Sequence, residues 1–124
     1  MSLKKYTKEH EWIELNDDIA TIGITNHAQE SLGDIVFVDL PEIGKIVIAG
    51  MEVSVIESVK AASDIYCPVD GEIIEINNNL NDNAALINEK AETDGWIFKV
   101  KTKDNKQLET HMNLNEYEAF LKQE

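Results

Sequence analysis

The sequence predicts a mainly β protein that has short helical inserts and a C-terminal helix. Short apolar runs recur along the chain and are separated by turn-forming residues, which is the pattern of antiparallel strands. Two of the turns match as Pro-x-x-Gly followed by an apolar run, at residues 41–44 and 68–71. This weak internal repeat reflects either two similar halves of a sandwich or the chance recurrence of a common turn. Near the C-terminus the apolar spacing changes to that of a helix.

The expected strands begin with a hairpin close to the N-terminus. Residues 16–18 are Asn-Asp-Asp, which tolerate turn geometry between two apolar runs. A short helix is expected next, because Thr25 can cap it and Gly33 can end it, with Ala28 and Leu32 on one face. The predicted strands, in order, are residues 12–15, 19–24, 35–40, 46–48, 51–56, 65–67, 72–76 and 96–101.

The last third of the chain contains the remaining helical segments. Residues 77–83 are polar and lack apolar periodicity, so we expect a loop there, with one helical turn after it at residues 84–88. Asn113 and Glu116 have capping-box spacing at the start of a helix expected at about 113–123. Its apolar stripe consists of Leu114, Tyr117, Phe120 and Leu121. In the preceding strand, Trp96, Phe98 and Val100 are expected to point inward and Lys99 and Lys101 outward.

Lys60 stands between two strand-like runs and is therefore predicted at the tip of a hairpin. A loop between paired strands holds its side chains in water while the sheet behind fixes their position. Ala61, Ala62 and Ser63 follow the lysine, and their small side chains leave its amine uncrowded. Exposed lysines are ordinary, however, so the tip alone assigns no function.

Composition limits the classes of partner. The chain has 124 residues, which suits one domain, and 11 basic against 24 acidic residues give a net charge of −13. Such a charge repels nucleic acid and anionic membranes, so neither is expected as a partner, and basic surfaces are favoured. No apolar run reaches the length of a membrane span, and the start lacks the apolar segment of a signal peptide. We expect a cytoplasmic protein in a bacterium, or a matrix protein if this is a processed mitochondrial form.

No catalytic or metal-binding residues are predicted. Cys67 is the single cysteine, so there is no internal disulfide and no cysteine cluster for a metal. His10, His27 and His111 are each without a second ligand or a nucleophile at a suitable spacing. A Gly-rich phosphate loop and a nucleophile elbow are also missing from the sequence. These absences favour a protein on which enzymes act rather than an enzyme.

The segment around Lys60 resembles the lipoylation segment of the H protein of the glycine cleavage system. It reads Glu57-Ser58-Val59-Lys60-Ala61 and continues through residues 63–66 to Pro68 and Gly71. The resemblance extends over almost the whole chain, and an ordered series of this kind is specific. The other matching stretches are His10-Glu11-Trp12, residues 20–25, Ala28-Gln29, residues 32–38, Leu40-Pro41, Asn88-Glu89, Gly95-Trp96 and residues 116–118.

The resemblance implies a lipoyl-domain-like barrel-sandwich hybrid of two small antiparallel sheets, in a single domain spanning residues 1–124. It also implies that Lys60 carries lipoate in amide linkage and that the chain is a non-catalytic carrier. Such a carrier accepts the aminomethyl group from the P protein (glycine decarboxylase), presents it to the T protein (aminomethyltransferase) and is reoxidised by the L protein.

Further site residues follow from the resemblance. Glu57 and Gly71 match family positions that help a lipoate-protein ligase or lipoyl transferase to recognise its target. Glu11 and Asp64 match a cleft that receives the loaded arm. Three departures from the family pattern concern arm shielding: Ser31 replaces a histidine of some relatives, Cys67 replaces a usual serine, and residues 91–94 replace a loop that commonly contains Pro, Tyr and Gly.

Other functions remain open. Biotin carriers usually flank their lysine with methionines, and lipoyl domains of 2-oxoacid dehydrogenases usually have Asp before it, whereas Val59 and Ala61 stand here. A lipoyl relay, which passes lipoate to other complexes, is an added role that the sequence leaves open. An acidic interaction domain whose lysine is never modified is what composition alone favours. We expect a monomer that docks transiently, because no exposed apolar stripe is evident in the sequence.

Overall fold

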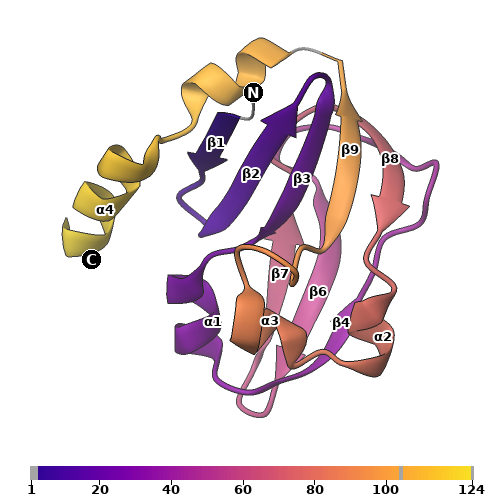
Figure 1. The fold of residues 1–124 in the computed structure, drawn as a ribbon, viewed down its shortest axis with the longest axis vertical. Helices are drawn as coiled ribbons and strands as arrows, with labels where there is room; N and C mark the ends of the chain where they lie inside the picture. Colours follow the sequence, from indigo (N-terminus) through magenta and orange to yellow (C-terminus); the bar gives the residue numbers. More distant parts are fainter. Residues whose placement is uncertain (1–2, 104, 124) are drawn as a thin grey trace.

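Two antiparallel sheets form the body of the protein (Figure 1). The computed structural model describes residues 3–103 and 105–123. One sheet has six strands in the order β1-β2-β3-β9-β8-β5, and the other has three in the order β4-β6-β7. The strands are β1 Leu3–Tyr6, β2 Glu11–Asn16, β3 Ile19–Ile24, β4 Ile35–Asp39, β5 Ile46–Val47, β6 Glu52–Ser58, β7 Ala62–Tyr66, β8 Gly71–Ile76 and β9 Phe98–Thr102.

The core lies between the inner faces of these sheets. Alternate residues of each strand point inward, as the period of two in an extended chain requires. Burying one such aliphatic or aromatic side chain stabilises the fold by about 1.5–3 kcal/mol. Fully buried members include Ile13, Ile22, Ile56, Ile73 and Phe98. The predicted fold class, two antiparallel sheets with helical inserts and a C-terminal helix, is confirmed.

The helical inserts gather at the end of the molecule where β6 turns into β7 (Figure 1). Helix α1 begins after Thr25, whose hydroxyl accepts a hydrogen bond from the N–H of Ala28 at 3.2 Å, and ends at Gly33, which has φ +80°. Both boundaries are those predicted, for the physical reasons given above. The helices are α1 Asn26–Leu32, α2 Asn79–Asp82, α3 Leu86–Lys90, the 3₁₀ helix η1 Asn105–Thr110 and α4 Leu114–Gln123.

Some local expectations were wrong. Residues 77–83, expected as a loop, contain helix α2, which buries Leu80, an apolar side chain with too few apolar neighbours to show periodicity. Strand β1 was not predicted, because its pairing with β2 is a relationship between segments rather than a pattern within one. Strand β9 begins only at Phe98, and Trp96 is half-buried instead of belonging to the strand.

Helix α4 closes the structure beside β1 (Figure 1). Its capping box is reciprocal, since the side chains of Asn113 and Glu116 each accept a hydrogen bond of 2.9 Å from the other's backbone N–H. Tyr117 is buried, but Leu114, expected in the apolar stripe, is 51% exposed because it lies in the first turn. No helix of the described ranges is long and apolar enough to cross a membrane.

Candidate functional site

Lys60 lies in the turn between β6 and β7, as predicted, and its side chain is exposed. Hydrogen bonds from one serine fix the turn. The Ser58 hydroxyl oxygen accepts the backbone N–H groups of Lys60 at 3.2 Å and Ala61 at 3.1 Å, and the hydroxyl donates to the Ala61 carbonyl at 3.1 Å. A side chain that satisfies its own turn in this way stabilises one backbone conformation. The lysine is therefore presented from an ordered turn.

The turn is also attached to the segment that follows α1. The backbone N–H of Val59 donates to the carbonyl of Asp34 at 3.0 Å. The stem of Lys60 lies over Gly33, because a Cβ placed on Gly33 would be 3.1 Å from Lys60 Cε and 3.8 Å from Nζ. Asn88 of α3 holds the same segment, since its side-chain amide donates to the Gly33 carbonyl at 2.8 Å and its oxygen accepts the N–H of Ile35 at 2.9 Å.

A cleft of about 190 Å³ opens between α1 and β7. It begins beside the turn, because Leu32 precedes Gly33 and Ser63 is three residues after Lys60. Histidines lie at the other end of α1, where the rings of His10 and His27 are 4.6 Å apart. The lining residues are Glu9, His10, Ile24, His27, Ala28, Ser31, Leu32, Ser63 and Ile65. The cleft thus extends from Leu32 and Ser63, beside the lysine turn, to the polar and aromatic side chains of His10 and His27.

Glu11 does not line this cleft. Its side chain is 1% exposed and accepts hydrogen bonds from the Thr7 hydroxyl at 2.9 Å and from the backbone N–H of Tyr66 at 3.1 Å. Burial raises the pKa of the Glu11 carboxyl to about 7, against the lowering effect of these two hydrogen bonds. Glu11 therefore links the start of β2 to β7, and so joins the two sheets.

Asp64 and Glu57 lie on the outer face of the three-stranded sheet, away from the cleft. Their side chains are exposed, whereas those of Ser63 and Ile65, which flank Asp64 in β7, line the cleft. The strand register places Phe37, Glu57 and Ala62 in one row across this face, and Asp39, Val55 and Asp64 in the next. Two acidic side chains predicted for different roles thus share one surface.

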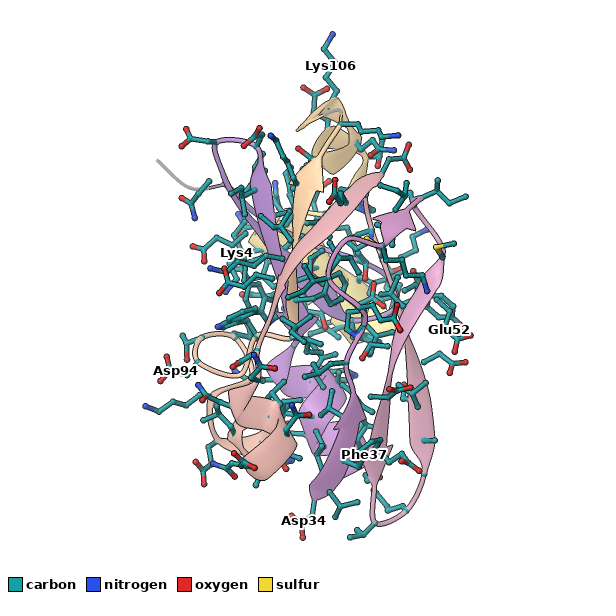
Figure 2. The ribbon with its side chains drawn as sticks, turned by 90° about the vertical axis from the view of Figure 1, so that its right-hand side faces the viewer. Lys4, Asp34, Phe37, Glu52, Asp94 and Lys106 are labelled. Carbon is teal, nitrogen blue, oxygen red and sulfur yellow. The ribbon has the colours of Figure 1, made fainter. Side chains whose placement is uncertain are left out.

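Apolar side chains are exposed close to Lys60. Val36, Phe37 and Val59 are 59%, 51% and 68% exposed, contrary to the expectation that no apolar stripe is exposed. Figure 2 shows Phe37 and Asp34 at the lower end of the molecule, beside the β6–β7 hairpin. An exposed apolar group with an acidic surround is typical of a docking surface.

Gly71 lies at the far end of the molecule from the lysine, because β8 begins at the upper end in Figure 1. It pairs with Val47 of β5 and Thr102 of β9 and is buried between them. A Cβ at this position would overlap the carbonyl oxygen of Lys101. Close packing in the sheet thus explains why a glycine stands at position 71, without any contact to an enzyme that approaches Lys60.

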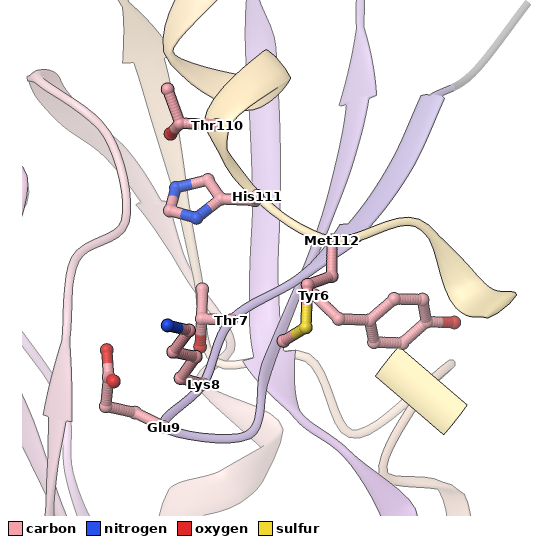
Figure 3. Close-up of a pocket in the computed structure, with 7 residues that line it drawn as sticks. All are labelled: Tyr6, Thr7, Lys8, Glu9, Thr110, His111 and Met112. Carbon is pink, nitrogen blue, oxygen red and sulfur yellow. The ribbon is translucent and has the colours of Figure 1, made fainter. Parts of the chain in front are cut away.

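A second cavity, of about 240 Å³, lies between the end of β1 and the segment that precedes α4 (Figure 3). Tyr6 and Met112 line this cavity, and their backbones are paired, because each donates its N–H to the carbonyl of the other. The His111 ring is engaged with the Pro68 carbonyl at 2.9 Å. Within residues 3–103 and 105–123, no group of three or more His, Cys, Asp or Glu side chains is placed to hold a metal ion.

The two-sheet fold and the lysine at the tip of an ordered hairpin define a lipoyl-domain-like β protein.

The family model of the glycine cleavage H-protein matches residues 4–124. The glycine cleavage system H protein of Thermotoga maritima is 51% identical over 124 residues, which cover all of both chains. That of Escherichia coli is 54% identical over 121 residues, covering 97% of this chain and 94% of the relative. The crystal structure of such a protein from Mycobacterium marinum superposes with a TM-score of 0.86 at 35% identity, covering 94% of each chain. The chain belongs to the glycine cleavage H-protein family.

Sequence reasoning found the lysine and missed most of its surroundings. Gly33 lies next to the Lys60 stem, and His10 and His27 line the cleft, yet each looked like an ordinary cap or an isolated histidine in the sequence. The family resemblance pointed to a cleft and assigned it to Glu11 and Asp64, whereas the described cleft is lined by Glu9 and Ser63 instead. Asp64 and Ser63 are neighbours in β7, so their side chains point to opposite faces of the sheet.

Proposed function

We propose that this chain is the lipoyl carrier of a glycine cleavage system and that Lys60 is its attachment residue. The observation that carries the proposal is the exposed Lys60 amine on a turn whose backbone is fixed by Ser58 and Asp34. Acylation of this amine would remove its charge and add a flexible dithiolane arm. The lipoyl group, when attached, supplies thiol–disulfide chemistry and carries the aminomethyl group, while the protein supplies position and recognition.

The residues beside Lys60 fit such an arm. The lysine stem lies over Gly33, at the mouth of the cleft between α1 and β7. Ile24, Leu32 and Ile65 give the cleft an apolar lining for a hydrocarbon chain. His10, His27 and Glu9 give its far end polar groups. Helix α1 has seven residues and is about 10 Å long at 1.5 Å per residue, so the cleft runs for a comparable distance.

The proposed partners are the P, T and L proteins and a lipoate-protein ligase or lipoyl transferase. This assignment is supported by membership of the family and by the surface around Lys60. Phe37 and Glu57 are cross-strand neighbours, so a partner that reaches for Lys60 meets an apolar ring beside a carboxylate. The Lys60 amine is the nucleophile that the lipoylating enzyme acylates, and no other acid, base or nucleophile of the chain is part of this proposal. Its role is to hold the arm, and to raise the arm's local concentration at each docked active site.

The test is the intact mass of the chain after reaction with lipoate, ATP and a lipoate-protein ligase, followed by peptide mapping. We expect one lipoyl adduct, on Lys60. A Lys101→Arg variant, which removes another exposed lysine, should gain the same adduct. No adduct on folded chain with an active ligase would overturn the proposal and favour an unmodified interaction domain. An adduct without glycine–bicarbonate exchange in the presence of P protein would instead favour another lipoyl carrier or a lipoyl relay.

A further inference from the structure

The C-terminal helix is connected to the cleft by one hydroxyl group. Tyr117 of α4 is 4% exposed, and its Oη lies 2.8 Å from His10 Nδ1 and 2.8 Å from Thr25 Oγ1. His10 lines the end of the cleft, and Thr25 caps the first turn of α1, which forms one cleft wall. A residue far along the chain thus contacts both structures that close this end of the cleft.

The backbone of His10 has a left-handed conformation. Its φ of 68° lies in the region that residues with a Cβ adopt at a cost of about 1–2 kcal/mol. The backbone is held there by hydrogen bonds from its N–H to the Thr7 carbonyl at 3.1 Å and from the Thr25 N–H to its carbonyl at 3.0 Å. The ring is packed against those of Tyr117 at 5.7 Å and Phe120 at 5.9 Å between centroids. The His10 ring therefore lies between α4 and the His27 ring of α1, whose centroid is 4.6 Å away.

Thr25 transmits the contact to α1. Its hydroxyl oxygen accepts the Ala28 N–H at 3.2 Å, so the same atom serves the helix cap and the Tyr117 hydroxyl. The chain of hydrogen bonds is complete in either direction: Thr25 donates to Tyr117 and Tyr117 to His10, or the two donations are reversed. In both arrangements the hydroxyl of Tyr117 is the shared member.

We propose that Tyr117 is a positioning residue for the arm cleft, holding His10 and the start of α1 at a fixed separation through its hydroxyl. The inference rests on the proposed function, since the cleft matters only if Lys60 carries an arm. Tyr117 does not line the cleft. It acts through His10 and Thr25. Helix α4 thus contributes to the carrier site, in addition to packing Tyr117 against Tyr6 and Trp12 in the aromatic cluster.

The test compares Tyr117→Phe with Tyr6→Phe. Tyr6 is a matched control because its ring stacks on that of Tyr117 at 4.8 Å with planes 8° apart, and it belongs to the same aromatic cluster. In the unlipoylated proteins, the ring nitrogens of His10 are followed by ¹⁵N NMR, and exchange of the Ala28 N–H by hydrogen–deuterium measurements. We expect Tyr117→Phe to change the His10 Nδ1 shift and to speed Ala28 exchange about fivefold, the factor of one neutral hydrogen bond. Tyr6→Phe should do neither.

The second readout uses lipoylated chain, reduced and loaded with formaldehyde and ammonium, then freed of both. Water hydrolyses the loaded arm: the carbon–sulfur bond breaks, and thiol, formaldehyde and ammonium are released. We expect release of formaldehyde to be about fivefold faster in Tyr117→Phe and unchanged in Tyr6→Phe. Thr25→Ser, which keeps the hydroxyl and the cap, should behave as wild type.

The outcomes separate the two proposals. Equal release from wild type and Tyr117→Phe, or an unchanged His10 signal, would overturn the positioning role. Failure of the folded wild type to gain the lipoyl adduct, with the expected His10 and Ala28 differences between wild type and Tyr117→Phe, would overturn the proposed function instead. A loss of folding in Tyr117→Phe is detected by circular dichroism. In that case Thr25→Val, which removes the hydroxyl group that bonds to Tyr117, takes its place. Formaldehyde release from Thr25→Val that is no faster than release from wild type would count against the proposal.

Discussion

The stem of Lys60 lies over Gly33, the residue that ends helix α1. A Cβ on Gly33 would be 3.1 Å from Lys60 Cε, which is closer than most van der Waals contacts. The lysine stem thus lies next to the residue that follows Leu32, a lining residue of the cleft. In the carrier that we propose, a group on Nζ would therefore start beside Leu32 and Ser63, which line the cleft.

Replacing Lys60 by Arg should leave the fold intact and abolish carrier function. The Lys60 side chain is exposed, so the change removes little buried surface, but a guanidinium is not acylated by the lipoylating enzyme. We expect an unchanged melting temperature, no lipoyl adduct by intact mass, and no glycine–bicarbonate exchange with P protein. Lys101→Arg serves as the control, with normal adduct and exchange. Exchange retained by Lys60→Arg would mean that another residue carries the arm.

Gly33→Ala tests the contact with the lysine. Gly33 has φ +80° and ψ −154°, a region reserved for glycine, so alanine should cost about 1–3 kcal/mol of stability. It should also displace the Lys60 stem and slow lipoylation. Gly44→Ala is the control, because Gly44 has φ +94° and a Cβ added to it would meet no atom within 4 Å. We expect both variants to lose stability in urea titrations, and only Gly33→Ala to be lipoylated more slowly; equal rates would contradict a role for the contact.

Gly71→Ala should impair lipoylation through the fold rather than through recognition. The added methyl group would overlap the Lys101 carbonyl between β8 and β9, and we expect a loss of about 3 kcal/mol in the free energy of unfolding. The measurement is a thermal melt, compared with the lipoylation rate at a temperature where the variant is still folded. A folded variant with a slow rate would instead assign Gly71 a direct part in recognition.

Glu11 predicts a pH dependence of stability. Its pKa in the fold is raised to about 7 from a usual value of 4.5, so between these values the folded state binds more protons than the unfolded state. Stability from this group is complete below about pH 4.5 and is lost as the pH rises through about 7. The Glu11→Gln variant cannot ionise, so its stability relative to wild type should increase by about 3 kcal/mol over that interval. Urea titrations at pH 4.5 and pH 8 measure the difference, and a difference independent of pH would show that Glu11 ionises normally.

Local chemistry made much of the fold predictable. The Thr25 cap, the Gly33 stop and the Asn113–Glu116 capping box are short-range devices, and all three stand where the sequence places them. Helix α2 was missed because it has one buried side chain, Leu80, and no side-chain cap. Strand β1 was missed because its two neighbours, β2 and Met112, are brought to it by tertiary structure.

The candidate site was predictable only in part, for the same reason. A lysine between two apolar runs is visible in sequence, whereas a contact between Lys60 and Gly33 is not. The burial of Glu11 is equally hidden, because a carboxylate at the start of a strand looks like a surface residue until Thr7 and Tyr66 are placed around it. Tyr117 and His10 are 107 positions apart, beyond the reach of any periodicity.

The hydrogen bonds of Ser58 and Asp34 to the turn have a consequence for the partners. Since they immobilise the backbone of residues 58–61, Lys60 Cα is a stationary pivot. Any group on the amine then sweeps a volume whose radius depends only on the lysine stem and the group itself. In the carrier that we propose, every enzyme that uses the arm would have to keep its reacting atoms within that radius of its own docking surface, so the chain would limit how deep those active sites can be.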